Sequence, residues 1–348
     1  FSQIGIFSGG SISTEDIALT LQRNVSFKSK TTGLDQFEFV HNALPEISLS
    51  EVDTSVSFLG KRLTAPLMVS CMTGGYKNAL SINRQLAEVC EECGIAMGVG
   101  SQRQALEDSQ YHRTFSVVRE SALSIPVVGN IGAAEVVGLA SSGSIQKLID
   151  LIRADAFTVH LNPLQEFLQP EGNTNFKGVL DGIGSLVRQS PVPIIVKEIG
   201  AGISANVAQR LLDVGVRYID VAGAGGTSWA GVETMRRKDK TVAEKFWDWG
   251  IPTSVALQNV AALKSSTTQF TLIGSGGISS GFDVAKCIAL GADVAASARP
   301  MLKTLQAKRK AGLRSLIEQW VEEIRGIMFL TGSKTIADLQ KAELVRYG

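Results

Sequence analysis

Four polar side chains follow an apolar stretch in the segment His-Leu-Asn-Pro-Leu-Gln-Glu, which ends at Glu166. In an extended chain His160 and Asn162 point to the same side, because side chains alternate with a period of two. Pro163 cannot donate to a strand ladder, so the strand stops there and Gln165 and Glu166 come after its end. A carboxylate beside His, Asn and Gln suits Mg²⁺, with water and the phosphate oxygens of a ligand completing its shell. For His160 alone we favour a hydrogen-bonded core histidine, whereas the whole segment favours a binding site.

Two turns towards the C-terminus, one rich in glycine and one polar, predict a phosphate site. Residues 274–281, Gly-Ser-Gly-Gly-Ile-Ser-Ser-Gly, follow one apolar run, and residues 296–300, Ala-Ser-Ala-Arg-Pro, follow the next. Glycine lets backbone N–H groups approach a phosphate closely, and the start of a following helix adds a positive dipole end. A plain tight turn is the alternative for either segment. Because Arg299 lies in the second segment, phosphate binding is the preferred interpretation.

Lys197 ends another apolar run and is expected inside the fold. A buried ammonium group is costly to desolvate unless it faces an anion. A phosphate or a reduced, deprotonated flavin ring would supply that anion, and an ion pair with Glu198 or Asp220 is the alternative. Other apolar runs are also followed by polar or glycine-rich segments: Cys71-Met72-Thr73-Gly74-Gly75, Gly100-Ser101-Gln102-Arg103, Asn130 and Ala222-Gly223-Ala224-Gly225-Gly226-Thr227-Ser228.

From about residue 65 onward, short β-branched runs alternate with amphipathic segments. The eight runs are Leu67–Met72, Ile95–Gly98, Pro126–Asn130, Ala156–Leu161, Pro193–Glu198, Tyr218–Ala222, Gln269–Gly274 and Asp293–Ser297. Eight strands, each followed by a helix, predict an α/β fold in which a parallel sheet closes into a (β/α)8 TIM barrel. An open, doubly wound sheet is the rival, but it would not put polar residues at the ends of so many strands.

These elements also predict the domain organisation. Residues 1–64 form an N-terminal extension and entry segment, and residues 65–348 form the barrel with its C-terminal helices, within one domain overall. The pattern over Gly312–Leu330 predicts a long helix packed on the outside or the bottom. Residues 223–250 are too long for a simple connector and are interpreted as a binding loop or lid. The first ten residues lack a starting Met and are left out of the fold prediction as a trimmed or tagged end.

The charge balance argues against a nucleic-acid partner. The 34 Lys and Arg residues face 33 Asp and Glu, whereas a nucleic acid requires a strongly basic surface. No apolar run is long enough to cross a bilayer, and the first residues do not resemble a signal peptide, so we expect no membrane partner. Cys90 and Cys93 are placed in a helix, and the four cysteines are expected to be free thiols, as in a reducing cytoplasm.

Taken together, these motifs resemble the type 2 isopentenyl-diphosphate isomerases, from about Thr32 to the C-terminus. The likeness rests on Met72-Thr73-Gly74-Gly75, Gly100-Ser101-Gln102-Arg103, the segment from His160 to Glu166, residues 222–228 and Ser275-Gly276-Gly277-Ile278. The segments ending at Glu166 and Ser228 are the most specific, because other FMN barrels share only the later glycine turns. The resemblance implies interconversion of isopentenyl and dimethylallyl diphosphate in isoprenoid biosynthesis. It also implies reduced FMN, NADPH as reductant, Mg²⁺, a cytoplasmic setting and a homo-oligomer, either tetramer or octamer.

The resemblance further implies roles for individual residues. The expected flavin contacts are Cys71, Met72, Thr73, Ser101, Asn130, Lys197, Thr227, Gly276, Gly277, Ser279, Ala298 and Arg299. The expected contacts of the diphosphate and its metal are Gln102, Arg103, His160, Asn162, Gln165 and Glu166, with Glu166 on Mg²⁺.

Gln165 is the expected catalytic residue. Its amide is too weak an acid to protonate an alkene unaided, so reduced flavin is the better candidate for the acid. Gln165 would then orient the substrate or relay the second proton, and Lys197 would hold the negative edge of the flavin.

Two positions depart from the family pattern. The family begins with an Arg-Lys pair and a nearby His that clamp the diphosphate, and residues 12–17, Ile-Ser-Thr-Glu-Asp-Ile, contain none of the three. Either the amino end is remodelled or the affinity for the diphosphate is reduced. Ser279 stands where an arginine is common beside the flavin phosphate, so one charge-assisted contact is missing.

Two other functions stay open. An FMN-dependent oxidoreductase of the 2-hydroxy acid oxidase type would need a base histidine near an arginine after a late strand, and no histidine follows His160. A non-catalytic flavin-binding homologue is the second, because the Arg-Lys pair is missing.

Overall fold

Eight parallel strands close into a barrel in this computed structural model, which describes residues 23–76 and 78–347, with the backbone alone for 140–142. The strands are β4 (Leu67–Val69), β5 (Ala96–Gly98), β6 (Val127–Gly132), β7 (Ala156–His160), β8 (Ile194–Lys197), β9 (Tyr218–Asp220), β10 (Thr271–Ser275) and β11 (Val294–Ser297). Sequential neighbours pair in parallel, and β11 pairs with β4 to close the ring. Every predicted run overlaps one strand, so the predicted (β/α)8 barrel is confirmed and the open sheet is excluded.

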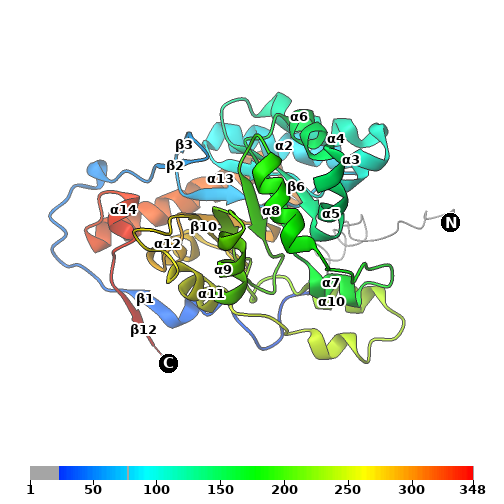
Figure 1. Cartoon of the computed structure of the whole chain (residues 1–348). Helices are drawn as coiled ribbons and strands as arrows, with labels where there is room; N and C mark the ends of the chain where they lie inside the picture. Colours follow the sequence, from blue (N-terminus) through cyan, green and yellow to red (C-terminus); the bar gives the residue numbers. More distant parts are fainter. Residues whose placement is uncertain (1–22, 77, 348) are drawn as a thin grey trace.

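Helices cover the outside of the barrel (Figure 1). They are α2 (Ala79–Cys93), α4 (His112–Ser121), α5 (Ala133–Ser142), α6 (Ser144–Ile152), α8 (Val179–Gln189), α9 (Ala205–Asp213), α11 (Thr253–Ala261), α12 (Gly281–Ala289) and α13 (Arg299–Thr331). Local signals set several boundaries: the Ser204 and Ser280 side chains cap the starts of α9 and α12, and Gly94 ends α2 with a positive φ of 66°. Cys90 and Cys93 lie in α2, and all four cysteines are free, as predicted.

The predicted helix Gly312–Leu330 is the second part of α13. Arg309 divides α13 because its backbone is non-helical, with φ 59° and ψ −168°. The helix follows β11 and packs against α2 and α12, so it lies on the outside of the barrel. It therefore completes the ring of helices.

A hairpin closes the amino-terminal end of the barrel. It pairs β2 (Val56–Phe58) with β3 (Lys61–Leu63), and its Phe58 and Leu63 pack against the apolar side chains inside the barrel. Beside it, Arg119 and Lys61 both bind the Asp155 carboxylate, at 2.5 and 2.8 Å. Arg119 also donates to four backbone carbonyl groups. This end of the molecule is filled and tied together, which leaves the carboxyl ends of the strands for a site.

The amino-terminal extension packs onto the barrel. The strand β1 (Phe37–Phe39) pairs with β12 (Leu344–Arg346) and so places part of the extension beside the last strand of the chain (Figure 1). Upstream, the N–H of Ser228 donates to the Val25 carbonyl at 2.7 Å, and the N–H of Ser254 donates to that of Thr32 at 2.9 Å. Residues 23–33 thus run across the loops that follow β9.

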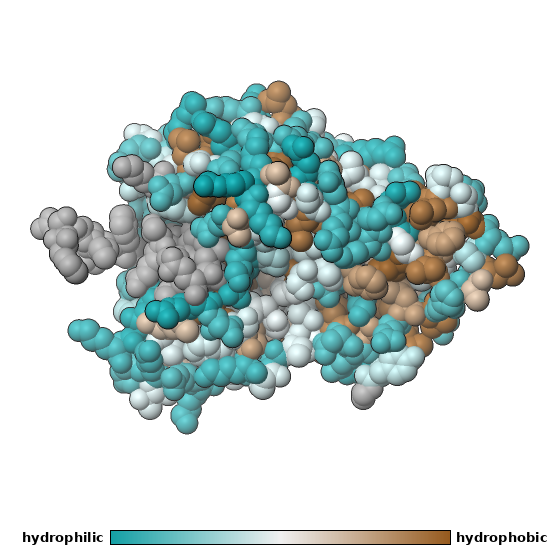
Figure 2. Space-filling view, turned by 180° about the vertical axis from the view of Figure 1, so that it is seen from behind, coloured by the Kyte–Doolittle hydropathy of each residue, from teal (hydrophilic) through white to brown (hydrophobic). Residues whose placement is uncertain are grey.

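The surface seen in Figure 2 is mostly hydrophilic, with hydrophobic residues gathered towards one end. Exposed apolar side chains include Leu44 and Leu330, whose segments are joined by a hydrogen bond from the Asn42 N–H to the Leu330 carbonyl. Among the described residues, every helix is too short or too polar to cross a membrane.

Candidate functional site

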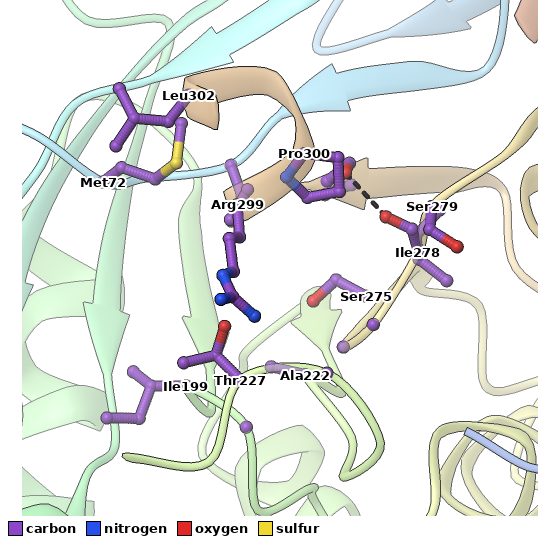
Figure 3. Close-up of a pocket in the computed structure, with 18 of the residues that line it drawn as sticks. Met72, Ile199, Ala222, Thr227, Ser275, Ile278, Ser279, Arg299, Pro300 and Leu302 are labelled. Atoms are coloured by element: carbon purple, nitrogen blue, oxygen red, sulfur yellow. Dashed lines mark hydrogen bonds between the residues drawn. The ribbon is translucent and has the colours of Figure 1, made fainter. Parts of the chain in front are cut away.

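A pocket of about 570 Å³ opens at the carboxyl ends of the strands. Its walls come from the segments after β4, β8, β9, β10 and β11, and Figure 3 shows side chains from these segments around one cavity. Nine residues expected to contact a flavin line it: Cys71, Met72, Lys197, Thr227, Gly276, Gly277, Ser279, Ala298 and Arg299. Ser70, Ser275 and Ser297 add hydroxyl groups to the lining.

The glycine turns at residues 222–228 and 274–281 pack backbone against backbone in the pocket wall. Gly276 has a φ of 101°, and a Cβ there would lie 2.1 Å from the Gly223 carbonyl oxygen. A Cβ on Gly226 would lie 2.6 Å from the Gly277 Cα. Side chains at these positions would push the turns apart, so packing requires glycine at both, and the positive φ is a second requirement at Gly276.

Arg299 projects from the start of α13 across the pocket towards Thr227 (Figure 3). Its guanidinium donates to Ser26 Oγ at 3.1 Å and to the Arg23 carbonyl at 2.9 Å, which ties it to the amino-terminal segment. Burial lowers the pKa of Arg299 from its usual value. By contrast, Ser279 is exposed at the rim, and both its N–H and its hydroxyl donate to Asp283, at 2.8 and 2.9 Å.

Lys197 is buried, and its Nζ donates to the Glu198 carbonyl oxygen. Within the described part of the chain, it forms no ion pair with Glu198 or Asp220, which was the alternative to an anion partner. Asp220 instead accepts from Ser275 Oγ at 2.5 Å. Burial raises the pKa of Asp220, and Lys197 and Ser275 oppose that rise.

The Cys71 thiol lies in the same pocket and stays protonated at neutral pH. Burial raises its pKa to about 11, while the nearby Lys197 ammonium opposes the rise. A thiol with so high a pKa is a weak nucleophile. Cys71 therefore contributes shape to the pocket.

A second group of polar side chains gathers on the short helix α7 (Pro163–Leu168), next to β7. Pro163 occupies its first turn, where a missing N–H costs nothing. Asn162 donates to Glu166 Oε1 at 2.8 Å and to Gln165 Oε1 at 3.2 Å, and all three residues are at most 2% exposed. The N–H of Asn173 donates to the other Glu166 oxygen at 2.6 Å. The turn thus places Gln165 and Glu166 inside the mouth, while Asn162 Oδ1 is buried without a hydrogen-bond partner among the described residues.

His160 faces this group from the end of β7. Its Nδ1 pairs with Asn130 Oδ1 at 3.0 Å, so the ring donates from Nδ1 and leaves Nε2 as an acceptor. Burial, together with the nearby Lys197 ammonium, lowers the pKa of His160 to about 3. The imidazole is therefore neutral in the described structure.

Other predicted residues serve the framework. The Gln102 amide donates to the Leu148 carbonyl at 3.0 Å and accepts from the Asn130 N–H at 3.2 Å, and Gln102 is fully buried. The Thr73 hydroxyl donates to Asn83. Neither residue lines the pocket. The Ser101 hydroxyl is buried without a partner among the described residues, and Ser101 also lies outside the pocket lining.

Arg103 starts α3 (Arg103–Glu107) beside the α7 group. It contacts the carboxylates of Glu107 and Glu135 at 2.9 and 3.4 Å. Burial raises the pKa of Glu135 to about 7; Arg103 opposes the rise, and the neighbouring Glu166 adds to it. Arg103 therefore sits among carboxylates as well as beside the expected diphosphate site.

Residues 223–250 contain two helices, α10 (Trp229–Arg236) and η4 (Ala243–Phe246), and contribute to the pocket as expected of a binding loop. Sequence reasoning missed Glu233 on α10, which is fully buried, accepts from Gln165 Nε2 at 3.3 Å and pairs with Arg236 at 2.9 Å. It also missed Trp229, which lines the pocket. The available signal was a glutamate shortly after a tryptophan, in a segment between two strands that is too long for a simple loop.

The two groups of residues meet at one end of the barrel. His160 and Lys197 are paired in register on β7 and β8, and Gln165 lines a small gap together with Glu198 and Trp229. No cluster of three or more His, Cys, Asp or Glu suited to a metal occurs in the described residues. A cation held here would depend on Glu166, neutral oxygens and a ligand of its own. Residues 12–17, where the family clamps the diphosphate, lie outside the described residues.

The fold and the pocket define a β/α-barrel protein of the flavin-dependent class: the family described as FMN-dependent dehydrogenase matches residues 15–135 and 153–346. The chain is 47% identical over 340 residues to an isopentenyl-diphosphate delta-isomerase of Chlorobium phaeobacteroides, covering 94% of this chain and 93% of the relative. The corresponding enzyme of Chlorobaculum parvum is 48% identical over 95% of both chains. That of Methanothermobacter thermautotrophicus is 41% identical over 96% of this chain and 92% of the relative.

The chain therefore belongs to the isopentenyl-diphosphate delta-isomerase family. Solved structures of mandelate oxidase share the fold, one with a TM-score of 0.67 at 17% identity over 96% of this chain and 94% of the oxidase.

Proposed function

We propose that this protein interconverts isopentenyl and dimethylallyl diphosphate with the help of reduced FMN. The observation that carries the proposal is the placement of Lys197 and Gln165 at the same end of the barrel, beside a pocket edged by two glycine turns and Arg299. The names of relatives at 41% to 48% identity support the same activity.

The described residues fit a flavin mononucleotide. The pocket is in the size range of cofactor sites, about 300–1,000 Å³, and it is walled by small residues on one side and by Met72, Leu302 and Ile199 on others. Arg299 and the N–H groups around Gly276 and Gly277 suit its phosphate. Lys197 suits the negatively charged edge of the reduced ring. When bound and reduced, with NADPH as the proposed reductant, the flavin would supply the acid that the alkene needs.

The α7 group suits the diphosphate and its Mg²⁺. Glu166 is the proposed metal ligand, and beside it lies Asn162 Oδ1, a buried oxygen without a hydrogen-bond partner in the described part of the chain. Arg103 and His160 would contact the phosphates. A phosphate near His160 would favour the protonated imidazole, so we expect substrate to raise the low pKa of this residue.

The chain's own residues would orient the substrate and move the second proton. Gln165 donates to Glu233 and would hold the reacting end of the alkene over the pocket. Glu233 could then accept or return a proton through Gln165 or a water molecule. Binding energy from the diphosphate, away from the reacting carbons, would pay for this alignment.

Two alternatives make different predictions. A 2-hydroxy acid oxidase of the kind that shares the fold would use a base histidine after a late strand, and no histidine follows His160 in this chain. A non-catalytic flavin binder would keep the pocket and lose activity.

The deciding experiment incubates the protein anaerobically with reduced FMN, Mg²⁺ and isopentenyl diphosphate. We expect dimethylallyl diphosphate to form. Oxygen consumption with a 2-hydroxy acid would favour the oxidase, and bound FMN with neither activity would favour the non-catalytic homologue. Failure to take up FMN would overturn the proposal as a whole.

The proposal includes a cytoplasmic setting and a homo-oligomer, either a tetramer or an octamer. The four free thiols favour a reducing compartment. The exposed Leu44 and Leu330 favour a subunit contact, because apolar patches of this kind are often covered by a partner. Light scattering of the purified protein measures the oligomer directly.

A further inference from the structure

Glu198 directly follows Lys197 and is 5% exposed. A single oxygen of its carboxylate, Oε2, accepts three successive backbone N–H groups, those of Ile199, Gly200 and Ala201, at 2.6, 2.7 and 2.5 Å. Burial raises the pKa of Glu198, and these three N–H groups oppose that rise. Ile199 and Gly200 both line the large pocket. Glu198 thus folds a pocket-lining segment around its own side chain.

Each of these hydrogen bonds also orients a carbonyl group. A trans peptide is planar, so its N–H and C=O point in opposite directions. Because the Ile199 N–H points at the carboxylate, the Glu198 carbonyl points away from it, and that carbonyl accepts Lys197 Nζ.

The next peptide unit repeats the arrangement. The Gly200 N–H points at the same carboxylate oxygen, so the Ile199 carbonyl points away. That carbonyl accepts the indole Nε1–H of Trp229 at 2.9 Å. One carboxylate therefore fixes two peptide planes, and each plane holds one side chain that lines the pocket.

We propose that Glu198 is a positioning residue that sets the places of Lys197 and Trp229 in the pocket by locking the two peptide planes after β8. It does not line the large pocket and acts only through the backbone. The role of this positioning in catalysis rests on the proposed function, in which Lys197 faces the flavin. The positioning itself is independent of that function.

The first test uses the protein without any cofactor. The indole N–H resonance of Trp229 is identified by its loss in Trp229→Phe, and its exchange with solvent is measured by NMR together with that of the amides of 199–201. We expect Glu198→Leu to speed the exchange of the indole N–H and of these amides by about two- to tenfold, the factor for loss of one ordinary hydrogen bond. Glu198→Gln keeps an oxygen acceptor but loses the charge, so its exchange should be faster than in the wild type and slower than in Glu198→Leu.

Glu91 offers a matched control. Its carboxylate also accepts backbone N–H groups, from Ser124 and Ile125, but these precede β6 at the other end of the barrel. We expect Glu91→Leu to leave the exchange rate of the Trp229 indole N–H unchanged. The proposal would be overturned if the exchange rate of the Trp229 indole N–H were unchanged in Glu198→Leu. It would also be overturned if that rate changed equally in Glu91→Leu. If Glu198→Leu does not fold, Glu198→Gln decides: faster exchange at 199–201 supports the proposal, and wild-type exchange overturns it.

The second test separates this proposal from the function. We expect Glu198→Leu to move the reduction potential of bound FMN in the same direction as Lys197→Met, with Glu91→Leu unchanged. A wild-type potential in Glu198→Leu would exclude an effect through Lys197. If the wild-type protein takes up no FMN, the proposed function fails, while the indole measurement still decides whether Glu198 positions Trp229.

Discussion

Gln165 donates from Nε2 to Oε1 of Glu233 at 3.3 Å, although 68 positions separate the two residues in the chain. The contact exists because α10 packs against α7 over the barrel mouth. It joins the residue expected to orient the substrate to a fully buried carboxylate.

Gln165→Asn should cripple turnover while FMN stays bound. The shorter side chain withdraws the amide from both Glu233 and the substrate, and misplacement by about 1 Å can cost on the order of 100-fold in rate. The measurement compares kcat under anaerobic, reduced conditions with the visible spectrum of bound flavin. Gln85→Asn, on the exposed face of α2, is the control and should keep normal turnover. Normal turnover in Gln165→Asn would remove this residue from the mechanism.

Arg299→Ala should weaken binding of FMN but not of riboflavin. The guanidinium is expected to contact the flavin only at its phosphate, and loss of a charged hydrogen bond weakens binding about 10- to 100-fold. Calorimetric titration with the two flavins measures the difference. Arg113→Ala removes an exposed arginine that pairs with Glu120 and should change neither affinity. Equal losses for both flavins would place Arg299 away from the phosphate.

Gly276→Ala should both destabilise the protein and weaken flavin binding. The new Cβ would overlap the Gly223 carbonyl oxygen and adopt a φ of 101°. We expect the free energy of unfolding to fall by more than the ~1–2 kcal/mol of an unfavourable backbone conformation. Gly60→Ala is the matched control, because Gly60 has a φ of 74° with nothing within 4 Å of its Cβ position. If denaturant unfolding shows the same loss in the free energy of unfolding for both variants, the two turns can separate freely.

His160 should make the protein less stable as the pH falls. Its folded-state pKa is lowered to about 3 from an ordinary value of 6.5, mainly by burial. Between these two values the unfolded chain binds a proton that the folded chain does not, so the free energy of unfolding decreases as the pH falls through this window. Denaturant unfolding at several pH values should show a smaller decrease in His160→Gln. Identical pH profiles for the two proteins would mean that His160 titrates normally in the folded state.

Much of the architecture was predictable from the sequence. The β-branched runs and the amphipathic segments between them are local patterns, and eight such units in one chain leave few arrangements other than a closed barrel. The same reasoning placed the glycine turns, Lys197 and the α7 group at one end, because the carboxyl ends of parallel strands share one end of a barrel. These predictions depend only on the order of residues along the chain.

The direction of individual side chains was decided only by the tertiary structure. Gln102 and Thr73 stand at strand ends like their neighbours, yet their polar groups are taken up by the Leu148 carbonyl and by Asn83. Glu233 enters the site because α10 packs on α7, and Glu198 turns back on its own backbone. The physical reason is that residue spacing specifies which end of the barrel a side chain reaches, whereas helix packing and competing hydrogen bonds determine where its polar atoms point.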